Sequence, residues 1–454
     1  MEKKMNQNYM KEKPVFPLLV SMALPMILSM LVNSLYNIVD SFFVAKIGED
    51  AMTALSLVYP VQNFITSVAV GFGVGIAAVI SMNLGAKNQT AANTAASKGL
   101  MLSAVHGIVI MIGTISMMPS FLGIFTSEKN VIELGLRYSN IAFSFSLFIM
   151  LGITYEKIFQ SVGKMKVTMI GLAGGCLVNI ILDPLLIFGI GIFPAMGMEG
   201  AAIATGIGQV SSLIIYLVFY KTKPIPVEIK GKYVFSKSAP TSKLYLIGIP
   251  ATLNMALPSL TVSCLNGILA TYSQSYVVIL GLYYKLQTFI YLPANGLVQG
   301  MRPVIGYNFG AGEHARVKKI FEVSLGMCAS IMLLGMVLCL LIPGRLVGMF
   351  STNPDTIHAG ETALRVICAG FVVSAISVTS CGALEGLGKG GESLVISVCR
   401  YVAVILPAAF VLSRFFGTMG VWNAFWVSEL ISAVVAALVY RRALKAEAAK
   451  QSEE

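Results

Sequence analysis

The sequence contains an internal repeat, and this repeat constrains the fold more than any other feature. Residues recur without a gap at an offset of 225, from Pro25 and Pro250 onward. Both copies are strongly apolar, and together they fill the chain. A duplicated apolar unit of this kind predicts a membrane transporter built from two related lobes. Matching pairs include Tyr59 with Tyr284, Gln62 with Gln287, Gly71 with Gly296, Gly75 with Gly300 and, at an offset of 220, Gly197 with Gly417 and Gly200 with Gly420.

The composition also indicates a membrane protein. The 454 residues are 56% hydrophobic and 12% charged, whereas soluble domains carry about 25% charged residues. A membrane-spanning helix needs about 20 mostly apolar residues. We therefore predict an all-α polytopic membrane protein with twelve transmembrane helices in two six-helix lobes. The predicted spans are 15–45, 51–84, 95–119, 132–158, 165–190, 198–220, 243–271, 275–308, 318–343, 356–386, 392–414 and 420–441.

The domain organisation and the orientation follow from this division. Six spans in each copy leave the two repeats parallel, so we expect an N-terminal lobe at 1–220, a cytoplasmic linker at 221–242 and a C-terminal lobe at 243–454. Most of the 32 Lys and Arg residues, with Lys157 and Arg400 among them, fall on the side of the N-terminus and the linker. The positive-inside rule therefore places both termini and the linker in the cytoplasm. Only Lys285 and Arg302 are interpreted as basic residues within spans.

Several function classes lack their sequence features. The chain has no GxxxxGK[ST] motif for ATP, so uphill transport would have to use an ion gradient. It has no HExxH or GxSxG motif, and we expect no enzymatic activity. The seven cysteines form no CxxC pair, so we expect no metal site beyond Na⁺ and no cofactor. The net charge of +11 is not interleaved with aromatic residues on one soluble face, which argues against a nucleic-acid partner.

Polar residues at helical spacing within the first-lobe spans are candidate functional residues. Polar groups inside a membrane are costly and are by default functional hypotheses, although Asn and Thr also join helices. Two neighbouring carboxylates in a low dielectric repel, so they would take up a proton or a cation, and their oxygens with those of Asn and Thr suit Na⁺. Asp40 could instead lie near the outer face, close to Lys46. The groups are Asn33, Tyr36, Asn37 and Asp40 in the first span, Asn179 and Asp183 in the fifth, and Thr205 and Gln209 in the sixth.

Further candidates lie outside these three groups. Glu156 and Gln160 near the end of the fourth span, with Tyr284 and Gln287 in the eighth, are assigned to a substrate cavity together with Asn33, Tyr36, Asn37 and Gln209. An interfacial ion pair is an equal alternative for Glu156 beside Lys157. Pro25 and Pro250 are candidate hinges, because a proline within a helix removes a hydrogen bond and produces a kink, although many membrane prolines are merely accommodated. The candidate charge partners are Lys285, Arg302, Glu385 and Glu429.

At residues 15–441 the chain resembles the MATE (multidrug and toxic compound extrusion) transporters. The motifs are LPMILSMLVNSLYNIVDSFFVAKIG, GVGIAAVISMNLGAKN, ALEGLGKG and GTMGVWNAFWVSEL, and VNIILDPLLIFG is most similar to the MepA-like bacterial branch. The resemblance implies a V-shaped pair of lobes with alternating access. It also implies antibiotic resistance by export of amphipathic, often cationic drugs in exchange for H⁺ or Na⁺. It implies cation coupling at Asp40, Asn179, Asp183 and Thr205, and Glu156 matches an acidic residue of the branch.

The alternative function is a lipid-linked or polysaccharide flippase of a related fold. Such a protein would need a cationic cavity, whereas the predicted spans hold two basic residues and several acids. We therefore expect small-molecule drugs or toxic organic cations as partners, and a monomer in the lipid bilayer of the bacterial inner (cytoplasmic) membrane. At the repeat offset Asp40 matches Leu265, Asn179 matches Val404 and Asp183 matches Ala408, which assigns coupling to the first lobe alone.

Overall fold

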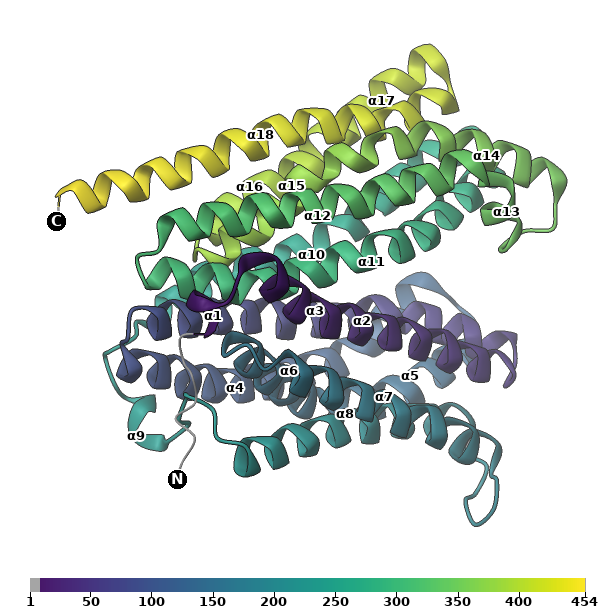
Figure 1. The fold of residues 1–454 in the computed structure, drawn as a ribbon. Coiled ribbons are helices and arrows are strands. Elements are labelled where there is room, and N and C mark those ends of the chain that lie inside the picture. Colours follow the sequence, from purple (N-terminus) through teal and green to yellow (C-terminus); the bar gives the residue numbers. More distant parts are fainter. Residues whose placement is uncertain (1–8, 454) are drawn as a thin grey trace. The chain divides into compact units, whose positions relative to one another are not determined.

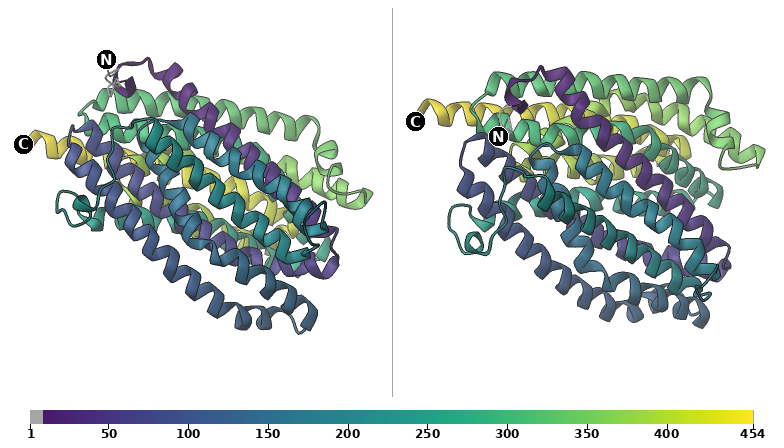
Figure 2. Two further views of the ribbon diagram at one scale, coloured as in Figure 1. Left: turned by 90° about the horizontal axis from the view of Figure 1, so that it is seen from below. Right: turned by 60° about the horizontal axis from the view of Figure 1, so that its bottom comes forward.

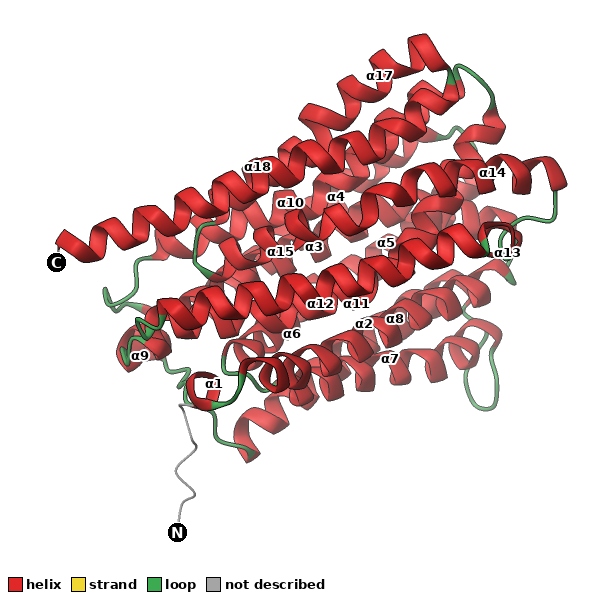
Figure 3. Ribbon diagram, turned by 45° about the horizontal axis from the view of Figure 1, so that its top comes forward, coloured by secondary structure: helices red, strands yellow, loops and turns green. Residues whose placement is uncertain are grey.

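The structure is a computed structural model that describes residues 9–453, and these residues form helices joined by turns and loops without a strand (Figure 3). An all-helical fold is what a lipid environment requires, because each helix satisfies its own backbone N–H and C=O groups where water is absent. Loops are short, and several helices carry side-chain caps. The side chain of Asn88 accepts from the Ala91 N–H, and that of Asn353 accepts from the Asp355 and Thr356 N–H groups.

The helices divide into two compact units. The first unit contains residues 28–252 and Tyr9, and the second contains Met10–Ile27 and Leu253 onward. In the first unit lie the second part of α2 (Val15–Ala45), α3 (Glu49–Gly85), α4 (Gln89–Phe125), α5 (Lys129–Ser144), α6 (Ser146–Ser161), α7 (Met165–Phe188), α8 (Gly197–Thr222), α9 (Gly231–Val234) and the start of α10 (Thr241–Ala270) (Figure 1).

The second unit contains the remainder of α10, the first part of α2 and all later helices. Its long α18 runs out to the C-terminal end of the chain (Figure 2). The elements are α1 (Tyr9–Glu12), of which Tyr9 belongs to the first unit, α11 (Gln274–Gly310), α12 (His314–Leu341), α13 (Pro343–Gly348), α14 (Pro354–Ile367), η1 (Cys368–Gly370), α15 (Phe371–Gly386), α16 (Gly390–Val398), the π-helix η2 (Cys399–Val404), α17 (Ile405–Phe416) and α18 (Thr418–Glu453).

The predicted twelve spans are confirmed when one bent pair of helices is counted as one span. Among the described residues, eleven helices are long and apolar enough to cross a membrane, and α5 with α6 forms a twelfth candidate that bends by 46°. Phe145 occupies the bend between them, and its ring packs against Gly206 of α8, where an added Cβ would lie 2.2 Å from the ring. The fourth span is therefore broken by packing and not by a proline.

The compact units differ from the predicted lobes, because α2 and α10 each pass from one unit to the other. The first part of α10 packs on α3 of the first unit, where a Cβ on Gly75 would lie 2.4 Å from the Leu244 carbonyl oxygen. The first part of α2 packs on α11 of the second unit, where a Cβ on Gly300 would lie 2.9 Å from the Ala23 nitrogen. These glycines occupy equivalent positions of the repeat. At both crossings, the lack of a side chain therefore lets the backbone of the neighbouring helix come close.

The linker at 221–242 also packs within the first unit and is not a separate segment. Val227 and Ala239 are buried in its core. The amide of Glu228 donates to Asn93 Oδ1 of α4 at 2.9 Å, and the amide of Lys230 donates to Ser97 Oγ at 3.1 Å. These hydrogen bonds hold the linker against the N-terminal part of α4.

Candidate cation site

Asp40 lies in the part of α2 that belongs to the first unit, and its side chain is buried. Tyr36, one turn earlier, is half-buried, whereas Asn33 and Asn37 are exposed. Asn37 Nδ2 donates to the backbone oxygen of Asn33 at 2.8 Å, so this amide bonds to its own helix. The predicted polar face of the first span is therefore divided: Asp40 is buried, Tyr36 is half-buried, and Asn33 and Asn37 are exposed.

The partners of Asp40 come from α7 and α8, which lie side by side (Figures 1 and 2). The two helices approach closely where Gly175 faces Gly208, since a Cβ on Gly208 would lie 2.9 Å from the Gly175 carbonyl oxygen. One turn away, Asn179 Nδ2 donates to Asp183 Oδ1 at 3.3 Å and to Thr205 Oγ1 at 3.4 Å. All three side chains are buried. The close crossing thus positions an amide, a carboxyl and a hydroxyl together.

The two carboxyl groups meet at this point. Asp40 and Asp183 are within hydrogen-bonding reach of each other, and the Tyr36 hydroxyl lies close to Thr205. Two carboxyl groups can share a hydrogen bond only when one of them carries a proton. The structure therefore brings together the four residues that were predicted to couple a cation: Asp40, Asn179, Asp183 and Thr205.

Two further residues of this site were not predicted to belong to it. The Tyr138 hydroxyl of α5 lies close to Gln62 of α3 and to Thr205, and Tyr138 is buried. Gln62 recurs in the repeat as Gln287, which was a signal that it has a structural or functional role. Tyr138 carried no such signal, because its position in the site depends on how α5 packs.

The electrostatics of this cluster are unbalanced. Among the described residues, neither Asp40 nor Asp183 forms an ion pair with a Lys, Arg or His. Lys46 lies over the ring of Phe42 at 4.5 Å from its centroid, and not against Asp40. Asp40 Oδ1, Asn179 Oδ1 and Asp183 Oδ2 are buried without a hydrogen-bond partner within residues 9–453. An uncompensated buried carboxylate costs several kcal/mol, and this cost favours uptake of a proton or a cation by the pair.

The oxygens at this site suit a proton or a hard monovalent cation. Two carboxyls, one amide oxygen and one hydroxyl form a donor set that matches Na⁺ better than a transition metal. Consistent with this, no group of three or more His, Cys, Asp or Glu in the described part of the chain could hold a metal ion.

Glu156 and Gln160, which were assigned to a substrate cavity, form a hydrogen-bonded cluster with Lys157 on α6, and this cluster contains the Glu156–Lys157 ion pair that was the alternative for Glu156. Lys157 Nζ donates to Glu156 Oε1 at 3.0 Å and to Gln160 Oε1 at 3.1 Å, and Gln160 Nε2 donates to Glu156 Oε1 at 2.7 Å. All three side chains are buried, and the Lys157 stem packs over Gly73. Lys157 was predicted on the cytoplasmic side, and the structure adds that glycine in α3 leaves room for its side chain inside the unit.

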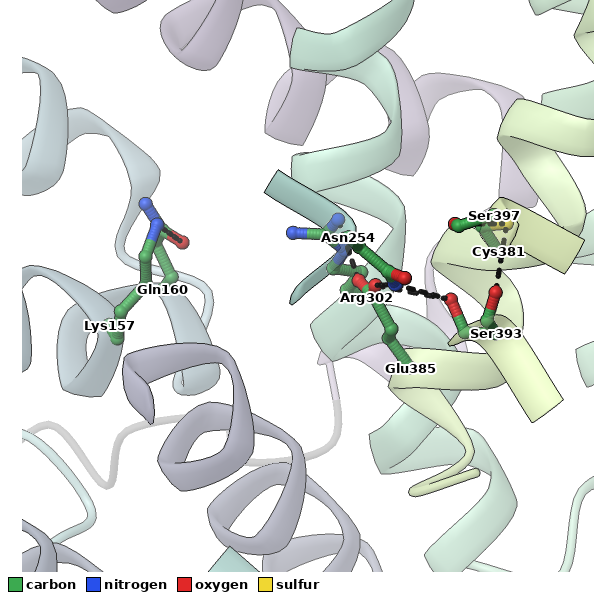
Figure 4. Close-up of polar contacts among 8 residues, drawn as sticks. All are labelled: Lys157, Gln160, Asn254, Arg302, Cys381, Glu385, Ser393 and Ser397. Carbon is green, nitrogen blue, oxygen red and sulfur yellow. Dashed lines mark hydrogen bonds and ion pairs between the residues drawn. The ribbon is translucent and has the colours of Figure 1, made fainter. Parts of the chain in front are cut away.

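In the second unit, Glu385 of α15 binds three other helices (Figure 4). Its Oε1 accepts from Asn254 Nδ2 at 3.0 Å and from Ser393 Oγ at 3.2 Å, and its Oε2 pairs with Arg302 Nη2 at 2.7 Å. Glu385 is 3% exposed. This carboxylate is therefore neutralised within the protein. Asn254 lies just beyond the point where α10 enters the second unit, so the cluster fixes that helix.

Arg400 and Glu429 form a second charged pair in the same unit. Arg400 was predicted on the cytoplasmic side, which was wrong: it is buried in η2, within the candidate span Gly390–Phe416. Of the other candidates, Lys285 is exposed, and Gln209 and Gln287 are half-buried. Tyr284 packs edge-on against Tyr283, with ring centroids 5.2 Å apart.

A duplicated set of membrane-crossing helices with buried acids is the arrangement of a polytopic membrane transporter. The profile of the MatE family matches residues 25–185 and 250–411. The chain therefore belongs to the MatE family, in agreement with the predicted family and with the expectation that it is not an enzyme.

Individual relatives are similar over almost the whole chain. The multidrug export protein MepA of Staphylococcus aureus (strain MSSA476) is 27% identical over 432 residues, which are 95% of this chain and 94% of that protein. MepA of Staphylococcus haemolyticus (strain JCSC1435) is 27% identical with the same coverage. These relatives agree with the predicted MepA-like branch.

Solved structures show the same fold. A MATE protein in the bent conformation has a TM-score of 0.92 at 21% identity, with 99% of this chain and 100% of that chain covered. A MOP superfamily transporter from Pyrococcus furiosus has a TM-score of 0.90 at 23% identity, with 98% and 99% covered. The predicted all-α polytopic fold is thus confirmed.

Proposed function

We propose that this protein is a cation-coupled multidrug exporter of the bacterial inner membrane, with both termini in the cytoplasm. It exchanges external H⁺ or Na⁺ for amphipathic, often cationic compounds by alternating access. The relatives named multidrug export proteins support the substrate class. The predicted topology supports the orientation, because the lysine-rich linker 221–242 lies on the side that the positive-inside rule assigns to the cytoplasm.

The observation that carries this proposal is the acid pair without a basic partner. Asp40 and Asp183 are buried and in contact, and several oxygens of their cluster lack a protein donor. A coupling ion that neutralises them stabilises the closed arrangement of α2, α7 and α8. When the ion leaves, two buried negative charges repel each other, and the part of α2 beyond Pro25 is free to repack. By linkage, ion and drug must each weaken the other's binding.

The buried basic residues argue against the flippase alternative. Arg302 is paired with Glu385, and Arg400 is paired with Glu429. Lys157 is held by Glu156 and Gln160. A carrier of lipid-linked phosphates would need several basic groups that the protein does not already neutralise. Among the described residues, the buried Lys157 and Arg400 and the half-buried Arg302 are neutralised, and Lys285 is exposed. The charge distribution therefore favours cationic cargo.

The proposal is tested by transport in membrane vesicles. Efflux of a fluorescent organic cation is measured with pH and Na⁺ gradients imposed separately, in the wild type and in Asp40→Asn. We expect one gradient to drive efflux in the wild type and the variant to lose this response. Glu133→Gln serves as the control, because Glu133 pairs with Arg137 on an exposed helix face and such pairs contribute little. Undiminished gradient-driven efflux by Asp40→Asn would remove Asp40 from the mechanism.

A further inference from the structure

The ion pair of Arg400 and Glu429 is built in an unusual way. Arg400 Nε and Nη2 both donate to Glu429 Oε1, at 2.9 and 2.6 Å. Glu429 Oε2 is buried and has no hydrogen-bond partner among the described residues. A guanidinium fork normally binds both oxygens of a carboxylate. Here the carboxylate keeps an acceptor that the arginine does not use, so the pairing is incomplete although it is buried.

Aromatic rings complete the surroundings of the guanidinium. Arg400 Cζ lies 5.1 Å from the ring centroid of Tyr401 and 5.8 Å from that of Tyr291. The Tyr291 hydroxyl bonds to Ser374 Oγ at 2.8 Å, which fixes its ring. Tyr284, which is half-buried, lies within electrostatic range of both charged groups. A carboxylate with aromatic faces around one cation is the chemistry by which proteins recognise organic ammonium ions.

The backbone is locally altered to place Arg400 there. The π-helix η2 interrupts the span between α16 and α17, and Ser428 Oγ donates to the Arg400 carbonyl at 2.9 Å. Single π-turns within α-helices occur frequently at functional sites. This irregularity brings the guanidinium and the carbonyl of Arg400 to the same face of α18.

The first unit has no equivalent of this cluster. At the repeat offsets, Arg400 matches Gly175, Ser428 matches Gly208 and Glu429 matches Gln209. Gly175 and Gly208 only allow close packing of α7 and α8. The scaffold can therefore be assembled without a charged pair at this position. Moreover, replacing a buried ion pair by well-packed apolar residues is often neutral or stabilising. Stability alone does not account for the pair.

We propose that Glu429, Tyr291 and Tyr401 form a binding site for the cationic group of a substrate, and that the Arg400 guanidinium occupies this site as a tethered competitor. The ligand class is a monovalent organic cation with an apolar body. It replaces the guanidinium at the Glu429 carboxylate, so that this carboxylate stays paired with one positive charge. This inference rests on the proposed export of organic cations, but it is independent of the coupling ion.

The test relies on opposite changes in ligand affinity when Arg400 and Glu429, the two partners of one ion pair, are replaced. Binding of ethidium to the purified full-length protein is measured by fluorescence anisotropy at fixed pH without a gradient. Glu429→Gln should weaken binding by about tenfold, which corresponds to ~1.4 kcal/mol. Arg400→Gln should strengthen binding by a similar factor, because the competitor is removed. The double variant should resemble Glu429→Gln. Tyr401→Phe should keep the affinity and Tyr401→Leu should lower it.

A purely structural ion pair predicts a different pattern. Both single variants would then weaken binding together with thermal stability, and this result would overturn the proposal. If Arg400→Gln does not fold, Arg400→Lys replaces it, because lysine retains the charge but loses the second donor to Glu429, and it should still strengthen binding. Unchanged or weaker binding by a folded Arg400→Lys counts against the site. If wild type binds no ethidium, the proposed substrate class itself fails, and this inference fails with it.

Discussion

The buried acidic residues of the two units are neutralised in different ways. In the second unit, Glu385 is paired with Arg302 and Glu429 with Arg400. In the first unit, Asp40 and Asp183 contact each other without a basic partner among the described residues. The same repeated scaffold thus holds two kinds of buried acid. Glu385 and Glu429 are neutralised by arginines of the protein, whereas Asp40 and Asp183 depend on a bound proton or cation.

The presence or absence of a basic partner does not simply depend on which unit an acid belongs to. Glu156 in the first unit is also buried, but it is held by Lys157 and Gln160 of its own helix. The aspartate pair is therefore the exception among the buried acids described above. An acid within a membrane span therefore indicates ion coupling only when no basic residue pairs with it. The residues packed around the acid have to be known before this can be decided.

The largest effect is expected when the first unit is given its own cation. In Asn179→Lys a tethered ammonium would lie beside Asp183 and neutralise the pair, as Arg400 neutralises Glu429. Gradient-driven efflux should fall by more than about tenfold, and the drug should no longer release protons or Na⁺ from the purified protein. Both quantities can be measured in proteoliposomes and by ion release. Retained ion release would show that the pair does not need an external cation.

A second prediction concerns the balanced charges of the second unit. Arg302→Met leaves Glu385 buried without its cation, and it should lower the free energy of unfolding by about 3 kcal/mol. Adding Glu385→Leu should recover part of this loss, because both charges are then gone. A double-mutant cycle of thermal unfolding in detergent measures the coupling between them. Additive effects would mean that the 2.7 Å contact contributes no interaction energy.

A third prediction compares the two helix crossings. Gly75→Ala and Gly300→Ala should each destabilise the protein by ~1–3 kcal/mol through overpacking. Gly75→Ala should have the larger effect, because its Cβ would lie 2.4 Å from a carbonyl oxygen, against 2.9 Å from the nearest atom at Gly300. Gly113→Ala in α4 is the matched control, since its Cβ would meet nothing within 4 Å. Equal thermal stability of all three variants would contradict the role of these glycines.

The smallest effect is expected for an exposed ion pair of the second unit. The hydrogen bond and charge of Lys11 lower the pKa of Glu313, and Glu313 raises the pKa of Lys11. For Glu313 the contribution is present above its unfolded-state pKa and is lost as the pH falls through its lower folded-state pKa. For Lys11 it is lost only when the pH rises above its folded-state pKa. The small difference in thermal midpoint between wild type and Lys11→Gln should vanish in acid. A difference that persists in acid would show that the pair is not its cause.

Local patterns predicted the spans and much of the first-unit site. The twelve apolar runs correspond to the observed helices because length and hydropathy determine what can cross a membrane. Asn179 and Asp183 are one turn apart, so their proximity follows from helix geometry, and the MATE resemblance connected them with Asp40 and Thr205. Arg400 was misplaced, because its burial within a span depends on a π-helix. The burial of Lys157 was not predicted, because it depends on the room that Gly73 leaves.

Contacts between segments far apart in the sequence could not be predicted from such local patterns. Nothing local to Arg400 indicates that Glu429, 29 residues later, will bind it. Nor does the repeat reveal which unit each half of α2 and α10 joins, because the same glycines would serve helices of either copy. Tertiary packing decides both questions.

Helices α2 and α10, which each contribute to both units, also determine when the two units can finish folding during synthesis. The first unit includes the start of α10, and the second includes residues 10–27. The first unit therefore lacks one packing partner until the ribosome has passed the linker, while residues 10–27 must await a surface on α11 that is made more than 200 residues later. At ~5–20 residues per second this delay lasts tens of seconds. The two halves, expressed as separate polypeptides, should consequently mature only when they are present in the same membrane.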